Sequence, residues 1–579
     1  MERQRPDVIV SPPISVVRAA RGFMSPIQVA VTACLSCAFW VITPQSSIAA
    51  RFDAKKDHQP ADESLFEWSP LIQEIEELLV EFELLAGPAD GRMTAETRQA
   101  IRTYQKQSKI PVDGVANEAL LKHMNNIGRG ESLKQRLLEA RNEQIEEART
   151  ALTENPATRD LVNPRVASRT ALPSGNGQKC LRAPTVDCLL REASGAIDSI
   201  TRDDYRDWAL RDVIRAQARA GRIADARASI RRLTDLRLIL VSLRETAIAL
   251  AESGHIDEAS DLTATIPEQG NRARALLAIA KSETKATRAY DTLLDLLPRL
   301  EDRTAAVEIA AELAADQSDR GATDKAEAAI AAIDDLPNGA VPTDVQRISL
   351  GAIATAYARI GLSEKALQTL KRIGDTSRDQ AALAEAAGLL AKRHKTGDAL
   401  ATADQLRAPQ LHVLALTKIA NAQLRLGDHD AARASLSRAQ SARHDIKRPF
   451  AADTALARIA IAWSKFPDYP HAFDNVKAIK SPALKARTLW RFATNEAPAT
   501  AAKDSTGIFS RATAATNHIE SPFDRAATLA RAAMEFAKKS QTKNARATFD
   551  MAVREARGIR NNWWRARIYS LLATALVAI

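Results

Sequence analysis

The chain has 579 residues, of which 26% are charged, 45% are hydrophobic and only 4% are aromatic. Ala and Leu supply most of the apolar fraction, while 22 Gly and 24 Pro are few for this length, so the composition excludes a β-protein and predicts an all-α fold. Lys and Arg alternate with Asp and Glu almost everywhere. The net charge of +10 therefore favours solvated helical surfaces over a nucleic-acid-binding protein.

Residues 1–50 have the order of an export signal. Two arginines precede an apolar run at 27–42, and small residues at 47–50 offer a cleavage site. An uncleaved membrane anchor over 23–43 is the main alternative, because that stretch spans roughly 20 residues. Cleavage of a lipoprotein type at Cys34 is a third reading. We expect an exported protein of the periplasm or cell envelope, which could remain anchored in the inner membrane by this segment alone.

The four cysteines divide into two pairs. Cys34 and Cys37 lie inside the export segment, so removal of the signal would leave Cys180 and Cys188. An even pair in an oxidising compartment predicts a disulfide that closes a small loop. A nucleophilic or metal-binding role lacks support, because no histidine is near and the spacing differs from C-x-x-C.

The next segment, residues 65–125, has the pattern of three short helices joined by two turns. Apolar residues at three- and four-residue steps predict a first helix that ends before "GPADG" at 87–91. Thr94 is placed to cap a second helix, which ends before "IPVDG" at 110–114, and a third helix covers 117–124. In each turn Asp would bind backbone N–H groups while Gly takes a positive φ. The residues assigned to these structural turns are Asp90, Gly91, Asp113 and Gly114.

This segment resembles the peptidoglycan-binding type 1 domain. The family pattern is a leucine-rich helix, Gly-x-x-Asp-Gly, Thr, an aromatic-Gln step, Leu-x-Val-Asp-Gly and a final helix. The sequence departs from it at Glu76, Thr94 and Ala119, where the family usually has Gln, Gly and Thr. The resemblance implies a small three-helix, non-catalytic module that holds its owner on the cell wall. The matching residues are Leu79, Gly87, Asp90, Gly91, Thr97, Ile101, Tyr104, Gln105, Ile110, Val112, Asp113, Gly114 and Leu120.

Candidate contacts to peptidoglycan lie mainly on the second helix of this module. A basic and partly aromatic face suits the carboxylates of stem peptides and the faces of sugar rings. For the four turn residues we favour a role in turn geometry. The candidate contact residues are Arg92, Arg98, Arg102, Tyr104 and Gln105.

Residues 126–179 combine a charged amphipathic helix with a linker. We expect the helix, at 131–153, to extend away from the small domain, and the Pro-, Ser- and Gly-rich stretch after it reads as a linker.

From 180 to 579 the sequence repeats a helical unit about ten times. In each unit a turn residue is followed by a small Ala that permits close approach of two helices. The spacing in "ARAGRIADA" resembles tetratricopeptide repeats and predicts a TPR-like α-solenoid of helical hairpins, whose concave face would bind a protein partner. The turn and Ala pairs are Gly221/Ala226, Gly254/Ala259, Thr284/Ala289, Gly321/Ala326, Gly361/Ala366, Pro467/Ala472, Gly507/Ala512 and Ser540/Ala545, with variants near Gly397 and Gly427.

The last predicted helix, in "RNNWWRARIYSLLATALVAI", has no following partner, so we expect it to cap the stack. Trp563 and Trp564 stand among arginines. Core packing is favoured for them over a membrane or nucleic-acid contact.

The sequence offers no catalytic site, metal site or cofactor motif. Nine histidines are scattered without the pairing of metal ligands, and no nucleophile motif is present. We therefore expect a non-catalytic envelope protein that binds peptidoglycan and scaffolds an unidentified protein partner, with no nucleic acid bound. The alternative is an accessory subunit or cryptic enzyme of peptidoglycan remodelling, of the hydrolase or lytic transglycosylase type.

Overall fold

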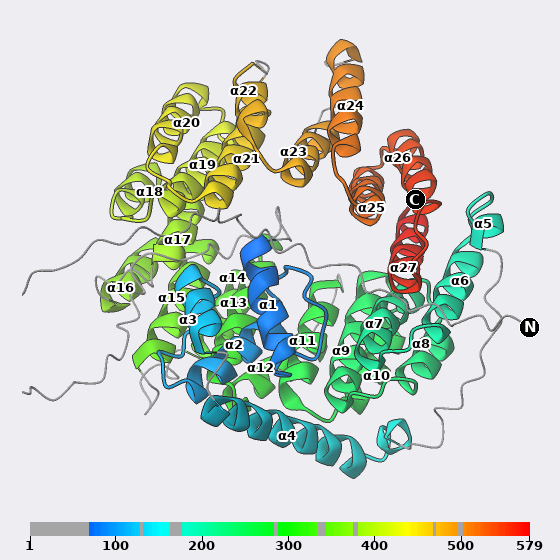
Figure 1. The fold of residues 1–579 in the computed structure, drawn as a ribbon. Coiled ribbons are helices and arrows are strands. Elements are labelled where there is room, and N and C mark those ends of the chain that lie inside the picture. Colours follow the sequence, from blue (N-terminus) through cyan, green and yellow to red (C-terminus); the bar gives the residue numbers. More distant parts are fainter. Residues whose placement is uncertain are drawn as a thin grey trace, which may run out of the picture. The chain divides into compact units, whose positions relative to one another are not determined.

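The computed structural model describes residues 69–127, 131–162, 177–282, 288–333, 343–373, 380–466, 470–495 and 502–579, and all regular elements in these residues are helices (Figure 1). The expected all-α fold is confirmed. The predicted export segment, with Cys34 and Cys37, lies outside the described residues. Within the described part of the chain, no helix has both the length and the apolar character needed to cross a membrane.

Three helices form the small module: α1 (Pro70–Glu81), α2 (Ala95–Gln107) and α3 (Glu118–Ile127). The side chain of Ser69 caps α1 by accepting a hydrogen bond from the Ile72 N–H, and Pro70 fits the first turn because it needs no N–H partner. Thr94 caps α2 in the same way, through the N–H of Thr97 at 3.0 Å. The module has its own core, to which all three helices contribute: Ile72, Ile75, Leu79, Ala100, Ile101, Tyr104, Leu120 and Met124.

A long helix, α4 (Glu131–Glu154), joins the module to the helices that follow. Its Leu137 and Ala140 complete the core of the module, whereas Leu152, near its other end, belongs to the core of the array. It packs against α2 and against α9 (Leu236–Glu252). The helix therefore leaves the module, but it is not a free extension, because it starts in the core of the module and ends in the core of the array.

Beyond α4 the chain forms an array of helical pairs. A short turn, η1 (Arg159–Leu161), and helices α5 (Gly177–Cys180) and α6 (Val186–Asp198) precede it, and α27 (Asn562–Ala578) ends it. Ten pairs occur among the described residues: α7 (Asp203–Arg219) with α8 (Ile223–Ile230), α9 with α10 (Ile256–Thr265), α11 (Gln269–Ser282) with α12 (Arg288–Leu296), which continues into η3 (Leu297–Arg299), α13 (Arg303–Asp319) with α14 (Thr323–Ala331), α15 (Thr343–Ile360) with α16 (Ser363–Ile373), α17 (Gln380–Lys392) with α18 (Thr396–Ala403), α19 (Pro409–Arg425) with α20 (His429–Arg443), α21 (Pro449–Trp463) with α22 (Pro470–Ala478), α23 (Pro482–Asn495) with α24 (Ala502–Asn517), and α25 (Pro522–Lys538) with α26 (Thr542–Ala556).

The turn and Ala pattern explains how most of these pairs form. At the first pair, Gly221 has a φ of 69°, which reverses the chain, and Ala226 is fully buried one turn into α8. Ser540 adopts a similar φ of 57° where no glycine is present. Gly507 departs from the prediction, because it lies inside α24 and not in a turn. In the α17–α18 pair the positive φ, 62°, belongs to His394.

The first helices of the pairs form a closed series of contacts. Each one packs against the next from α7 through α25 to α27, and α27 packs in turn against α6 and α7 (Figure 1). Arg567 of α27 donates to Asp212 of α7 at 2.8 Å, and the Trp563 ring lies 5.0 Å from that of Tyr205. As expected, α27 pairs with no second helix of its own among the described residues, but it packs against both ends of the array and so does not simply cap one end. Its apolar side chains belong to the same core cluster as side chains from both ends of the array.

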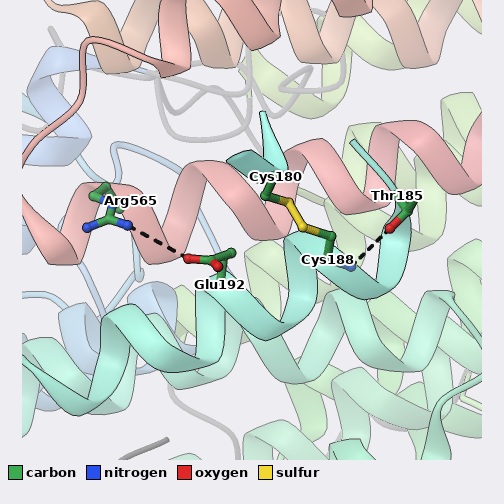
Figure 2. The surroundings of a disulfide bond; sticks show 5 residues. All are labelled: Cys180, Thr185, Cys188, Glu192 and Arg565. Atoms are coloured by element: carbon green, nitrogen blue, oxygen red, sulfur yellow. Dashed lines mark hydrogen bonds and ion pairs between the residues drawn. A yellow bond between two sulfur atoms is a disulfide. The ribbon is translucent and has the colours of Figure 1, made fainter. Parts of the chain in front are cut away.

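A disulfide fixes the segment that meets α27. The structure joins Cys180 of α5 to Cys188 of α6, with 5.8 Å between their Cα atoms (Figure 2). Figure 2 also shows Arg565 of α27 directed at Glu192 of α6, 4.0 Å away. A Cβ added at Gly177 would lie 2.7 Å from the Arg565 side chain, so α5 and α27 approach closely.

Candidate functional site

The first turn of the module is held by a buried carboxyl group. Glu76, on α1, accepts a hydrogen bond from the Gly91 N–H at 2.8 Å and one from the Thr97 hydroxyl at 2.7 Å. Asp90 accepts the Arg92 N–H at 3.1 Å, and Gly91 has a φ of 73°. These bonds tie α1, the turn and the start of α2 together.

The second turn is held in the same manner by an amide. The Gln105 side-chain oxygen accepts the N–H groups of Asp113 and Gly114 at 3.0 and 2.8 Å, and its nitrogen donates to the Asp113 carboxylate at 2.6 Å. Gly114 has a φ of 67°, and a Cβ there would meet the Arg102 side chain at 2.9 Å. All four predicted turn residues therefore lie in these two turns, where they shape the backbone.

Burial controls the charge of Glu76. Desolvation and the nearby Asp90 carboxylate raise the pKa of Glu76 to about 9, against the lowering effect of the bonds from Thr97 and Gly91. The carboxyl group is therefore protonated at neutral pH. A neutral carboxyl still accepts from the Gly91 N–H, and it can give its proton to the Thr97 hydroxyl, which reverses the direction of that bond but keeps the pairing. The side chain of Gln would bond in the same way, so the departure from the family pattern at this position preserves both partners.

Two of the predicted contact residues lie in the core of the module. Tyr104 and Gln105 have no exposed surface, and the Tyr104 ring stacks on Phe82 at 5.6 Å. The Tyr104 hydroxyl lies 3.2 Å from Nδ1 of His123, and burial raises the pKa of Tyr104 to about 12.

Two others face carboxylates of the array. Arg98 lies 3.7 Å from Glu308 of α13, and Arg102 lies 3.9 Å from Glu308 and 3.7 Å from Asp302, which caps α13. Burial lowers the pKa of Arg102, and these two carboxylates offset part of the shift. All three distances are longer than a hydrogen bond, so the pairs are weak by geometry, although the Arg102 side chain is only 15% exposed. The fifth candidate, Arg92, is half-buried at the first turn.

A stronger contact between module and array surrounds Glu96 in the first turn of α2. Glu96 accepts from Arg244 of α9 at 2.5 Å, and Arg244 also donates to Asn271 of α11 at 2.8 Å. Arg211 of α7 lies 4.0 Å from Glu96 and donates to Glu245 at 2.9 Å. The Arg244 side chain is only 7% exposed and that of Arg211 10%, so these charges stabilise one another away from bulk water.

This group of charges is continuous with the contact made by α27. Arg215 of α7 lies 3.9 Å from Glu245 and 2.9 Å from Asp212, and Asp212 accepts from Arg567. Burial alone would raise the pKa of Glu96, but Arg244 and Arg211 lower it to about 2. The same balance, with Arg211 as the main cation, lowers the pKa of Glu245. Module, first array helices and last helix are thus joined by one buried ionic network.

The five predicted contact residues do not form one surface. Only Arg98 and Arg102 are neighbours on one face of α2, and this face is directed toward α13 of the array. Sequence reasoning missed Glu96, whose main partner Arg244 lies 148 residues further along the chain, because local periodicity carries no signal for such a pairing.

Among the residues that the structure describes, no three His, Cys, Asp or Glu side chains are grouped so that they could hold a metal ion. Buried charges of the module are engaged in turns and in docking.

Comparison with known protein families matches residues 69–124 to the family described as "Putative peptidoglycan binding domain". The match covers α1, α2 and most of α3, which are the helices that carry both turns. Comparison with curated proteins finds no match. The chain therefore contains a peptidoglycan-binding domain, which implies a location in the cell envelope, followed by a large helical array. The matched residues end before the array, whose tetratricopeptide-like identity stays a prediction.

Proposed function

We propose that the protein is a non-catalytic component of the cell envelope that binds peptidoglycan through residues 69–124 and scaffolds a protein partner through its helical array. The observation that carries the proposal is the family match over a module whose two turns are fully formed. Export to the periplasm, by a cleaved or an anchoring N-terminal segment, belongs to the same proposal.

The wall-binding face includes Arg98 and Arg102. Their long ion pairs with Glu308 and Asp302 cost little to break, so stem-peptide carboxylates can compete for the same guanidinium groups. The buried contact of Glu96 holds the module in place during this exchange.

Co-sedimentation of the purified protein with peptidoglycan sacculi tests the proposal. We expect binding, a loss of about tenfold in affinity for R98E/R102E, and a several-fold gain for D302N/E308Q, which frees both arginines. E301Q/E327Q on the same part of the array is the matched control, since it removes two exposed carboxylates for which the structure shows no ion pair with Arg98 or Arg102. A protein that stays in the supernatant would refute wall binding, and an unchanged R98E/R102E variant would remove this face from the site.

Absence of catalysis is tested separately. We expect no clearing on zymograms that contain peptidoglycan, and any clearing would favour the alternative of a wall-remodelling enzyme.

A further inference from the structure

Charge is divided unevenly along the chain. Residues 341–579 contain 37 Lys and Arg against 20 Asp and Glu, a net charge of +17, whereas residues 1–340 contain 44 against 51, a net charge of −7. The second half of the array is therefore strongly basic, and the acidic first part of the chain offsets much of its charge in the net charge of the whole chain. Such a half attracts anions over distances of about one Debye length.

Six of these cations occupy similar positions on successive first helices of the array. They lie at or near the C-terminal ends of the first helices α15, α17, α19, α21, α23 and α25, each of which packs on the next. Helices in contact are separated by about 8–10 Å, so the cations succeed one another at a similar spacing. We call this set the basic ladder; its members are Arg359, Lys392, Arg425, Lys465, Arg491 and Lys539.

At two members of the basic ladder, hydrogen bonds to the preceding first helix fix the position of the side chain. Lys465, just after α21, donates to the Asn421 side chain of α19 at 2.7 Å. Lys539, just after α25, donates to the Thr494 carbonyl of α23 at 2.8 Å and to the Asn495 side chain at 2.7 Å. Each ammonium therefore lies over the end of the preceding first helix.

Ion pairs neutralise cations of this register in the first half of the array, but among the described residues they do so at only one member of the basic ladder. Arg219 pairs with Glu252 at 3.0 Å, and Lys281 with Glu312 at 3.3 Å. Within the basic ladder Arg491 pairs with Glu535 at 3.1 Å. No carboxylate among the described residues forms an ion pair with the other five members: Arg359, Lys392, Arg425, Lys465 and Lys539.

Mutual repulsion within the basic ladder is visible at Lys465. Its side chain is exposed, yet desolvation by surrounding protein, followed by the charges of Arg425, Arg491, Lys539 and Lys392, lowers its pKa to about 8. The partial negative charge at helix C-termini stabilises cations there, but it does not cancel this repulsion. A bound anion would relieve it.

We propose that the basic ladder is a second peptidoglycan contact, which binds carboxylates of the wall's stem peptides. A row of cations on consecutive helices suits a polymer with recurring carboxylates better than a single small anion. Peptidoglycan is the anionic polymer that the matched module brings to this protein, so the inference rests on the proposed wall binding. Once the module is bound, further carboxylates of the same polymer are present at high effective concentration.

The test uses the full chain with three charge reversals, K392E/K465E/K539E. The matched control is K447E/K477E/K543E, which reverses three exposed lysines of the same half outside the basic ladder. Far-UV circular dichroism confirms folding, and K392Q/K465Q/K539Q serves as a second variant if the reversals disturb the array. On sacculi we expect the ladder variant to lose about tenfold in affinity or more, and the control less than about twofold.

Two further measurements separate this inference from the proposed function. Ile101→Asp disrupts the core of the module, which is separate from the cores of the array, and we expect it to leave weaker, salt-sensitive binding that the ladder reversals abolish. Sacculi whose stem carboxylates have been converted to amides should bind the ladder and control variants equally. If the ladder and control variants bind intact sacculi alike while Ile101→Asp weakens binding, the basic ladder is refuted and the module's function stands. If the wild-type protein does not bind sacculi, both the basic ladder and the proposed wall binding are refuted.

Discussion

Glu76 gives the module a pH dependence that the amide usual at its position would not have. The folded protein keeps this carboxyl protonated up to about pH 9, whereas in the unfolded chain it ionises near 4.5. Above 4.5 the unfolded state has released a proton that the folded state retains. The free energy of unfolding therefore falls as pH rises from about 5 to about 9, by up to ~1.4 kcal/mol per pH unit from this group.

We predict that Glu76→Gln removes this pH dependence, because the Gln side chain can accept from the Gly91 N–H and donate to the Thr97 hydroxyl oxygen without carrying a titrating proton. Urea unfolding of the full chain is monitored by hydrogen exchange in α1 and α2. Near pH 5 the variant and the wild type should have the same free energy of unfolding, and at pH 8 the variant should be more stable. The exposed Glu74→Gln is the control. A difference between Glu76→Gln and wild type that stays constant with pH would contradict the protonated state.

At the scale of elements, the docking of α2 on α7 and α9 depends on Glu96. Removing its carboxylate leaves the charges of Arg244 and Arg211 in excess in a mostly buried site. We predict that Glu96→Ala weakens docking by on the order of 2 kcal/mol, and that hydrogen exchange of α2, α4 and α9 speeds up while α19 to α23 are unaffected. Glu77→Ala, an exposed change on α1, should leave exchange in α9 as in wild type.

The same contact should weaken in acid. Because the folded pKa of Glu96, about 2, lies below its ordinary value of 4.5, its contribution is present above about pH 4.5 and is lost as pH falls toward 2. Exchange in α2 and α9 that stays slow throughout this range would refute the role given to Glu96.

Helices and turns could be predicted from the sequence because their signals are local. Apolar spacing, the Thr94 cap and the turn and Ala pattern each act within a few residues, and the structure follows them except at positions such as Gly507, which lies within α24. Docking and closure could not be predicted in this way. Glu96 and Arg244, or Asp212 and Arg567, are brought together by the stacking of many helices, and no periodicity in the sequence marks them as partners.

At the scale of the whole molecule, closure changes how stability is distributed. In an open array each helical pair depends on its immediate neighbours, so a defect at one end is not felt at the other. Here α27 packs against α25 and α26 on one side and against α6 and α7 on the other. Arg567 binds Asp212 and lies 4.8 Å from the Trp563 ring, so one side chain contributes to both the ionic and the aromatic contact.

We therefore predict that Arg567→Ala destabilises helices at both ends of the array. The loss of a charged hydrogen bond and a cation–π contact is on the order of 1.5–2 kcal/mol, so hydrogen exchange should rise roughly tenfold in α6 and α7 as well as in α25 and α26. Arg560→Ala, an exposed change just before α27, is the control and should alter neither end. An Arg567→Ala effect confined to α25 and α26 would mean that α27 behaves as the end of an open stack, and that closure adds little to stability.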